Sequence, residues 1–189
     1  MRQAVRIIRD EHRALAAVVH GLLYFARRAK EGVEPNFRLM WTMVRYVADF
    51  PQTFHHPKEE TCLFDRLAGR TPEAETVLAE LRRQHLDDFR LLADIKAALG
   101  DYEGGAANGA AKLVETVERF ADLTWAHMHV EEAVLLPLAE AHLGDADWAE
   151  IDAAFGANGD PRFGADAADG FHQMFRTILE QAPAPIGLA

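Results

Sequence analysis

The sequence contains a single cysteine, Cys62, and this scarcity excludes several kinds of site. One thiol cannot form an internal disulfide or a zinc knuckle, so the fold does not depend on sulfur chemistry. Any metal that the chain binds must therefore be held by nitrogen and oxygen atoms. Cys62 follows His55 by seven residues and projects toward the same helix face, but we interpret it as a buried thiol rather than a redox group.

Long apolar runs and clusters of basic residues are also missing. No apolar run approaches the roughly 18 residues that a membrane span needs, and the opening segment MRQAVRIIRDEHR is too charged for a signal peptide. The formal net charge is −10 and the basic residues are scattered, which disfavours a phosphate-backbone partner. We therefore expect a cytoplasmic protein that binds neither membranes nor nucleic acids.

Strand-like alternation of Val, Ile and Thr is absent, whereas apolar residues recur with the 3.6-residue period of helices. The fold is therefore predicted to be all-α. Gly32 with Pro35 ends the first helix, and Thr71 with Pro72 begins the third as N-cap and first helical residue. Four long helices should form a bundle; they are predicted over residues 2–30, 36–69, 71–100 and 110–143.

Prolines inside these helices, Pro51, Pro57 and Pro137, each remove an i→i−4 hydrogen bond and should kink or reset the helix. The chain beyond residue 144 has a different pattern. It holds a short amphipathic piece, a loop rich in Gly and Asp, a last helix over 170–181 and a tail that composition predicts to be frayed. We predict a metal-binding domain over residues 1–144 and a helical extension over 145–189 that packs on it.

An internal duplication is the strongest feature of the sequence: IIRDEHRALA aligns with ELRRQHLDDF, and HHPKEETCLFD aligns with HMHVEEAVLLP. The duplication repeats three polar residues together with their apolar flanks. His12 and His85 are 73 positions apart, and the pairs His55/His127 and Glu59/Glu131 are each 72 apart.

Histidine and glutamate four residues apart, as in both repeats, lie on one face of a helix and can reach the same metal ion. One such pair is a weak motif, but the duplication makes it specific. A carboxylate inside a bundle is costly unless it is paired or bound to a cation. Four imidazoles and two carboxylates divide into two sites, each close to the two-His-one-carboxylate set of non-haem iron. The predicted metal ligands are His12, His55, Glu59, His85, His127 and Glu131.

With these residues, the sequence over about 7–143 resembles the hemerythrin-like HHE cation-binding family. That family has one histidine in the first helix, H-x-x-x-E in the second, and the same pattern again in the third and fourth. The resemblance implies an up-down-up-down four-helix bundle with two non-haem iron ions, which bind oxygen, nitric oxide or peroxide. Iron rests mainly on the resemblance, because zinc or manganese also suits three-ligand N/O sites.

The chain departs from the oxygen-carrying hemerythrins at two positions. They have a further histidine four residues after the third-helix histidine, where this chain has Phe89. They also place an aspartate five residues after the fourth-helix histidine, where this chain has Glu131 at four and Glu132 at five. Fewer nitrogen ligands would leave both irons open, which favours sensing or irreversible reactions over reversible oxygen storage.

The resemblance therefore leaves three functions open: a sensor of oxygen or nitric oxide, a di-iron enzyme that decomposes peroxide or reduces nitric oxide, and a protein that repairs or supplies iron centres. The sequence does not predict an oligomeric state. His56 and His129 neighbour predicted ligands but lie about 100° or more around the helix, so we leave them outside the ligand set. Glu60 and Glu132 are either acceptors for ligand histidines, alternative bridging ligands or solvated charges.

Overall fold

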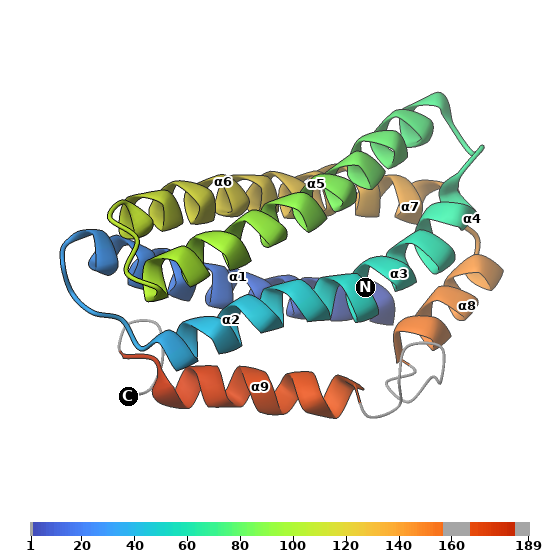
Figure 1. The fold of residues 1–189 in the computed structure, drawn as a ribbon. Coiled ribbons are helices and arrows are strands. Elements are labelled where there is room, and N and C mark those ends of the chain that lie inside the picture. Colours follow the sequence, from blue (N-terminus) through green and yellow to red (C-terminus); the bar gives the residue numbers. More distant parts are fainter. Residues whose placement is uncertain (1, 157–166, 184–189) are drawn as a thin grey trace.

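The structure is a computed structural model that describes residues 2–156 and 167–183. Within these ranges every regular element is helical and no strand occurs, so the predicted all-α class is confirmed (Figure 1). The elements are α1 (Gln3–Lys30), α2 (Phe37–Phe50), η1 (Pro51–His55), α3 (His56–Lys58), η2 (Glu59–Phe64), α4 (Asp65–Leu67), α5 (Pro72–Glu103), α6 (Gly109–Val130), η3 (Glu131–Leu135), α7 (Leu136–His142), α8 (Asp145–Gly156) and α9 (Ala167–Gln181), where η denotes a π-helix.

Two helices begin at side-chain caps that the sequence indicates. The Asn36 Oδ1 atom accepts a hydrogen bond from the Leu39 backbone N–H at 3.1 Å, and the Thr71 Oγ1 atom accepts one from Ala74 at 3.0 Å. Each cap satisfies a backbone donor that has no partner in the first turn of a helix. The predicted starts of the second and third helices are therefore confirmed.

The helix that begins at α2 continues through its prolines to Leu67 by widening into π turns rather than by breaking. Pro51 and Pro57 have no N–H to donate, so regular α-helical bonding is interrupted at both. The His56 N–H instead reaches back five residues to the Pro51 carbonyl, and the Leu136 N–H does the same to Glu131. The π turns end at His55 and begin at Glu59 and Glu131, all of them predicted ligands. Such turns are frequent at functional sites.

Four helical segments form the bundle. Helix α1 packs against α2 and α6, and α5 packs against the same two helices, so each long helix has two neighbours (Figure 1). Two apolar clusters fill the interior. One includes Leu15, Phe54 and Phe120, and the other includes Ile8, Leu63 and Leu135. The up-down-up-down order of the bundle stays a prediction.

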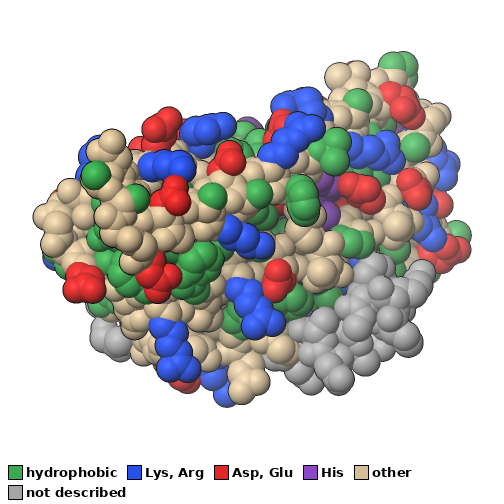
Figure 2. All heavy atoms as spheres, in the orientation of Figure 1, with side chains coloured by type: hydrophobic (Ala, Val, Ile, Leu, Met, Phe, Trp, Pro, Cys, Tyr) green, Lys and Arg blue, Asp and Glu red, His purple; other side chains and the backbone are tan. Residues whose placement is uncertain are grey.

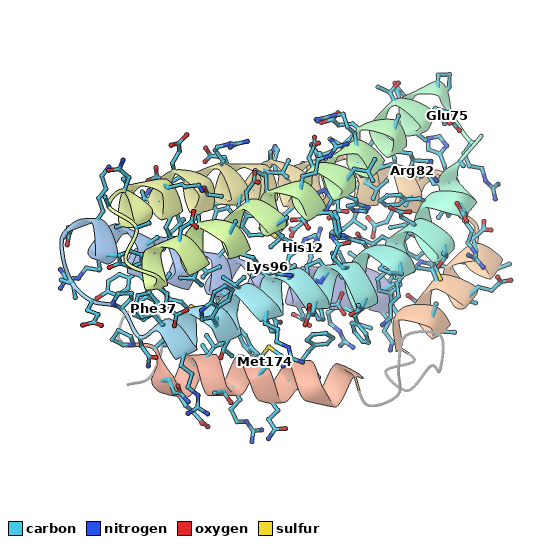
Figure 3. All side chains as sticks on the ribbon, in the orientation of Figure 1. His12, Phe37, Glu75, Arg82, Lys96 and Met174 are labelled. Atoms are coloured by element: carbon cyan, nitrogen blue, oxygen red, sulfur yellow. The ribbon has the colours of Figure 1, made fainter. Side chains whose placement is uncertain are left out.

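Helices α8 and α9 lie outside these four segments. Helix α8 packs against α1 and contributes Trp148, Ile151 and Phe155 to the second apolar cluster. Helix α9 packs against α2, and Figure 3 shows Met174 directed toward it. The division into domains at residue 144 stays a prediction. Residues 157–166 and 184–189, which include the Gly/Asp-rich loop and most of the predicted frayed tail, lie outside the described residues.

The surface carries both signs of charge without segregation. Figure 2 shows acidic and basic side chains interspersed over one face of the molecule. Among the described residues, no helix has both the length and the apolar character that crossing a membrane would require.

Candidate metal centre

The six residues predicted as ligands converge in the middle of the bundle, between the two apolar clusters. All six residues are at most 8% exposed. Along α1, His12 lies between Ile8 of one cluster and Leu15 of the other; Figure 3 shows His12 inside the bundle. The other predicted ligands occupy the same level of the bundle, so a polar layer separates two apolar ones. Each repeat supplies one histidine from its first helix and a His–Glu pair from its second.

The two glutamates lie between the two pairs of histidines. One oxygen of Glu59 is 3.2 Å from His55 Nε2, and its other oxygen is 3.7 Å from His85 Nε2. In the same way, one oxygen of Glu131 is 3.0 Å from His12 Nε2, and the other is 3.4 Å from His127 Nε2. Each carboxylate therefore connects an imidazole of the first repeat with one of the second, which is the arrangement expected of bridging ligands.

The polar atoms that face the centre of this layer have no hydrogen-bond partners in the structure. They are the Nε2 atoms of His12, His55, His85 and His127, and both carboxylate oxygens of Glu59 and Glu131. Buried polar atoms are normally hydrogen-bonded, because leaving one without a partner costs roughly 1–3 kcal/mol. Eight such atoms pointing at one another fit a site built for cations, and the donor set of imidazole and carboxylate suits iron, zinc and manganese.

The structure divides these side chains into two groups whose ligand atoms lie within 4.8 Å of one another. The first group is His12, His55, Glu59 and Glu131, and the second is His56, Glu59, His85 and His127. A metal ion could be held by each group, with Glu59 shared. Both sets contain the mixed nitrogen and oxygen donors that the sequence predicts.

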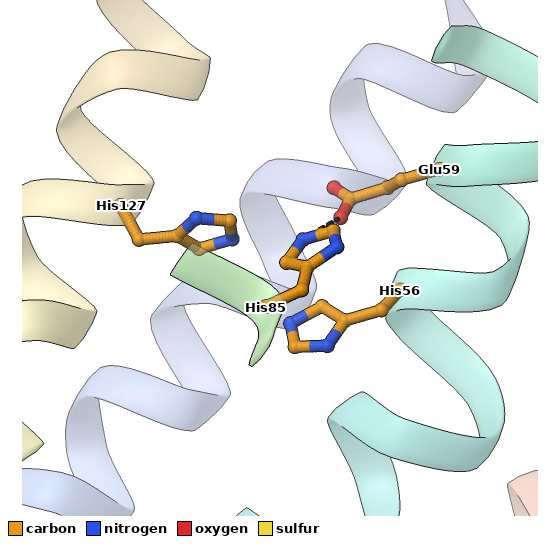
Figure 4. Close-up of side chains that lie close together, drawn as sticks. All are labelled: His56, Glu59, His85 and His127. Atoms are coloured by element: carbon orange, nitrogen blue, oxygen red, sulfur yellow. Dashed lines mark ion pairs between the residues drawn. The ribbon is translucent and has the colours of Figure 1, made fainter. Parts of the chain in front are cut away.

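His56 is the functional candidate that sequence reasoning left out. A regular helix would turn it about 100° away from His55. The π turn over Pro51–His55 accommodates an extra residue, so that both side chains are buried, at 1% and 8% exposure. The His56 ring stacks on His85 with 3.8 Å between centroids, and Figure 4 shows both beside His127 and Glu59. Pro51 and Pro57 were the sequence signal that could have indicated the burial of His56, because prolines interrupt regular helical hydrogen bonding.

The Nδ1 atoms of the four predicted ligand histidines, on the far side of each ring, have oxygen partners. His12 donates to Glu132 at 2.9 Å, His55 to Glu11 at 2.8 Å and His85 to Glu60 at 2.7 Å. An ionised carboxylate can only accept, so the proton of each neutral ring is on Nδ1 and the Nε2 lone pair faces the centre. Such partners orient metal-binding histidines and increase their donor strength.

The family comparison agrees with this geometry. A family model described as the hemerythrin HHE cation binding domain matches residues 3–139. The chain belongs to the hemerythrin HHE cation-binding family. No curated protein and no solved structure matches the chain significantly. The match covers α1 through most of α7 and so includes all of the residues in the polar layer of this HHE domain.

The partners of the histidines reveal one difference between the repeats of the HHE domain. Glu132 and Glu60 are equivalent positions, and each supports the histidine of the other repeat. Glu11 precedes His12, and its equivalent Gln84 precedes His85. Glu11 accepts from His55, whereas the amide oxygen of Gln84 accepts from His127 at 3.0 Å. The first group therefore has two imidazoles backed by carboxylates, and the second has one.

Burial is the largest cause of the pKa shifts of His56, His127 and Glu59 in the HHE centre. Burial, and then the charges of His85 and His55, holds the pKa of His56 well below its usual value. Burial also lowers the pKa of His127 to about 4. Both rings therefore stay neutral at pH 7 and can bind metal. Burial, and then the charge of Glu131, raises the pKa of Glu59 well above its usual range, because two carboxylates without a cation resist ionising together.

A small cavity of about 20 Å³ lies beside the five histidines of the HHE centre. Leu15, Phe120 and Thr124 form part of its wall, and neither glutamate ligand lines it. One water needs about 10–15 Å³ of such volume, so the cavity admits a ligand of one or two heavy atoms. Exchangeable positions on bound metal would open into this space.

Four other residues near the HHE site differ in their burial. The Phe64 ring stacks on His85 with 5.8 Å between centroids. Phe89, at the position of the carriers' further histidine, is 64% exposed, so a histidine at this position would point away. His129 is exposed, in agreement with its exclusion from the ligand set. Cys62 is a buried free thiol.

Replacing His56 tests whether this residue binds metal in addition to the six predicted ligands. His56→Ala should lower the affinity of the second metal ion by at least about tenfold, as for loss of an ordinary ligand or its support. His129→Ala is the matched control and should leave both affinities unchanged. Metal content after dialysis against a graded chelator series measures the effect. Equal metal binding by the wild type and both variants would show that His56 is no ligand.

Proposed function

We propose that this HHE domain holds two non-haem iron ions and uses them to bind and sense, or react with, oxygen, nitric oxide or peroxide. The bridging position of Glu59 and Glu131 between two histidine groups supports a dinuclear centre. The proposed ligands are His12, His55, Glu59, His85, His127 and Glu131, joined by His56. When bound, the iron would supply electrons and coordination positions for the small ligand.

The size of the cavity beside the centre supports the proposed class of ligand. At about 20 Å³ it has room for a diatomic molecule or peroxide and none for an organic substrate. Its walls combine the imidazole edges with Leu15, Phe120 and Leu123. A diatomic-sized space beside two proposed metal positions suits reversible binding or reduction of such ligands.

His56 changes the expectation about open coordination positions. The chain has Phe89 where oxygen carriers have a further histidine, and that difference alone would leave two open irons. His56 can replace the missing nitrogen from another helix, giving three imidazoles in one group and two in the other. The first group also has two carboxylates and the second has one, so each group offers four donor residues. With equal numbers of donors, ligand binding by a sensor is as well supported as turnover by an enzyme.

Asp88 is the acidic residue of the chain that lines the ligand cavity. It lies on α5 three residues after His85, and its carboxylate accepts a hydrogen bond from the Gln52 side chain at 3.1 Å. Burial raises its pKa to about 7. The equivalent residue of the first repeat is Leu15, which lines the same cavity. One repeat thus presents an ionisable group to the ligand, and the other an apolar one.

Spectroscopy on the metal-loaded protein tests the proposed function. Protein purified without oxygen and loaded with Fe(II) should contain two irons per chain. Oxygen, nitric oxide and peroxide, added in turn, should each change its optical spectrum if they reach the metals. Rapid consumption of peroxide would favour an enzyme, and stable ligand-bound spectra would favour a sensor. Loading with one iron, or no spectral response to any of the three, would refute the proposal.

Azide binding tests the role of Asp88 in the cavity. Below pH 7 its carboxyl is neutral, and above pH 7 its negative charge should repel the anion. Like charges roughly 10 Å apart at an effective dielectric constant near 20 repel each other by ~1.5 kcal/mol. Because Asp88 is only partly ionised at pH 8, the affinity should fall about fivefold from pH 6 to pH 8. Asp88→Asn and Asp88→Leu, the latter matching Leu15, should remove this fall. A fall of the same size in both variants would contradict it.

A further inference from the structure

A second cavity, of about 190 Å³, lies between α1, α2 and α9. It exists because α9 packs more closely against α2 than against α1, while Ala14 of α1 leaves space opposite. An engineered apolar cavity of about 150 Å³ holds benzene. This cavity therefore admits a six-membered ring with a short substituent, far more than the space beside the metal centre.

Aromatic rings line most of this second cavity: Tyr46, Phe50, Phe54, Phe171 and Phe175. They belong to one interacting cluster, in which Phe50 and Phe171 are 5.3 Å apart edge to face and Tyr46 and Phe175 are 5.8 Å apart. Ring faces attract cations, as the Lys58 ammonium, 3.7 Å from the centroid of Phe54, already shows in this part of the molecule.

Three other polar residues line the cavity: Asp10, Glu11 and His172. Asp10 and His172 are exposed, whereas the Glu11 side chain is 12% exposed, so Glu11 supplies the buried charge of the cavity. No Lys or Arg occurs among the described lining residues. Burial, and then the charge of Glu11, raises the pKa of Tyr46, so its hydroxyl keeps its proton. A carboxylate among aromatic rings is the combination that recognises organic ammonium groups.

We propose that the second cavity binds a small organic cation, namely a primary amine attached to a ring or short apolar chain, with its ammonium group on Glu11. Glu11 also accepts the Nδ1–H hydrogen bond of His55. An ammonium on this carboxylate competes with His55 for it and weakens the support of that imidazole. The cavity thus becomes a regulatory site for the metal centre, and this second part rests on the proposed function.

Three ligands of one shape and different charge test the binding site: benzylamine, toluene and benzoate. Titration calorimetry on the full chain should show benzylamine binding at least tenfold more tightly than toluene, and no binding of benzoate. Glu11→Gln should reduce the preference for benzylamine over toluene to less than about threefold. Asp10→Asn, the matched control, should keep it. Equal binding of benzylamine and benzoate, or a preference that Glu11→Gln leaves intact, would overturn the proposal.

A cavity-filling variant locates the site. Ala14→Leu should abolish benzylamine and toluene binding while leaving the metal content unchanged, because Ala14 does not line the metal cavity. Undiminished benzylamine binding in Ala14→Leu would place the ligand elsewhere and refute the site. Since the charge series uses the wild-type chain, the test remains decisive if this variant folds poorly.

Failure of the binding site and failure of the proposed function are distinguishable. Benzylamine binding is measured by heat and does not require iron chemistry. Regulation is measured separately, as a benzylamine-dependent shift of the optical spectrum of iron-loaded protein that Ala14→Leu abolishes. Binding without a shift in a protein that responds to oxygen would refute the regulatory part alone.

Discussion

Two glutamates that face each other in the interior of a helical bundle impose the constraint on which this structure depends. Glu59 and Glu131 are fully buried, and each presents both oxygens to imidazole nitrogens. Ionised carboxylates in an apolar interior repel each other and lose their hydration, so the arrangement is unfavourable unless cations lie between them. The rest of the bundle can be understood as the support that holds such cations in place.

Three features of the structure provide this support: apolar clusters, hydrogen-bond partners of the rings, and π turns. The apolar clusters on either side of the polar layer exclude water, which strengthens the electrostatic attraction between metal and ligand. Glu11, Glu60, Glu132 and Gln84 orient the ligand rings through Nδ1. The π turns alter the helical register around the centre, which brings His56 into the interior without breaking the helix. The cost of irregular helices is thereby offset by an additional nitrogen donor.

Much of the fold, and the convergence of the six predicted residues, could be predicted because local rules determine them. Asn36 and Thr71 are good N-caps, and the apolar period of 3.6 residues indicates the long helices. The duplication places equivalent residues at equivalent positions of the two repeats, which is why His12 and His85 could be predicted to lie in the same site. His56 was not, because its position depends on a departure from the regular period that two prolines impose. The cavity under α9 was also unpredictable, since it depends on how three helices pack.

The pairing of Glu60 and Glu132 shows where sequence reasoning reaches its limit. Their positions in the repeat were evident, and three roles remained open for them. The structure pairs each with the histidine of the opposite repeat, a relation between helices that spacing along one helix cannot reveal. Glu11 and Gln84 also pair with a histidine on another helix, but within their own repeat. Their difference in charge makes the two halves of an otherwise duplicated centre unequal.

Thermal unfolding of the metal-free and metal-loaded forms, for the wild type and Glu59→Gln, tests the central claim most directly. Metal removal should lower the melting temperature of the wild type, because Glu59 is then buried beside Glu131 and must either carry a charge without a cation or take up a proton. Glu59→Gln removes this ionisable group, so its metal-free form should be more stable than the metal-free wild type, by about 1–3 kcal/mol, while it gains less from metal. Glu60→Gln serves as the control and should behave like the wild type. A metal-free wild type that melts at the temperature of the loaded form, or a metal-free Glu59→Gln that is less stable than the metal-free wild type, would contradict this account.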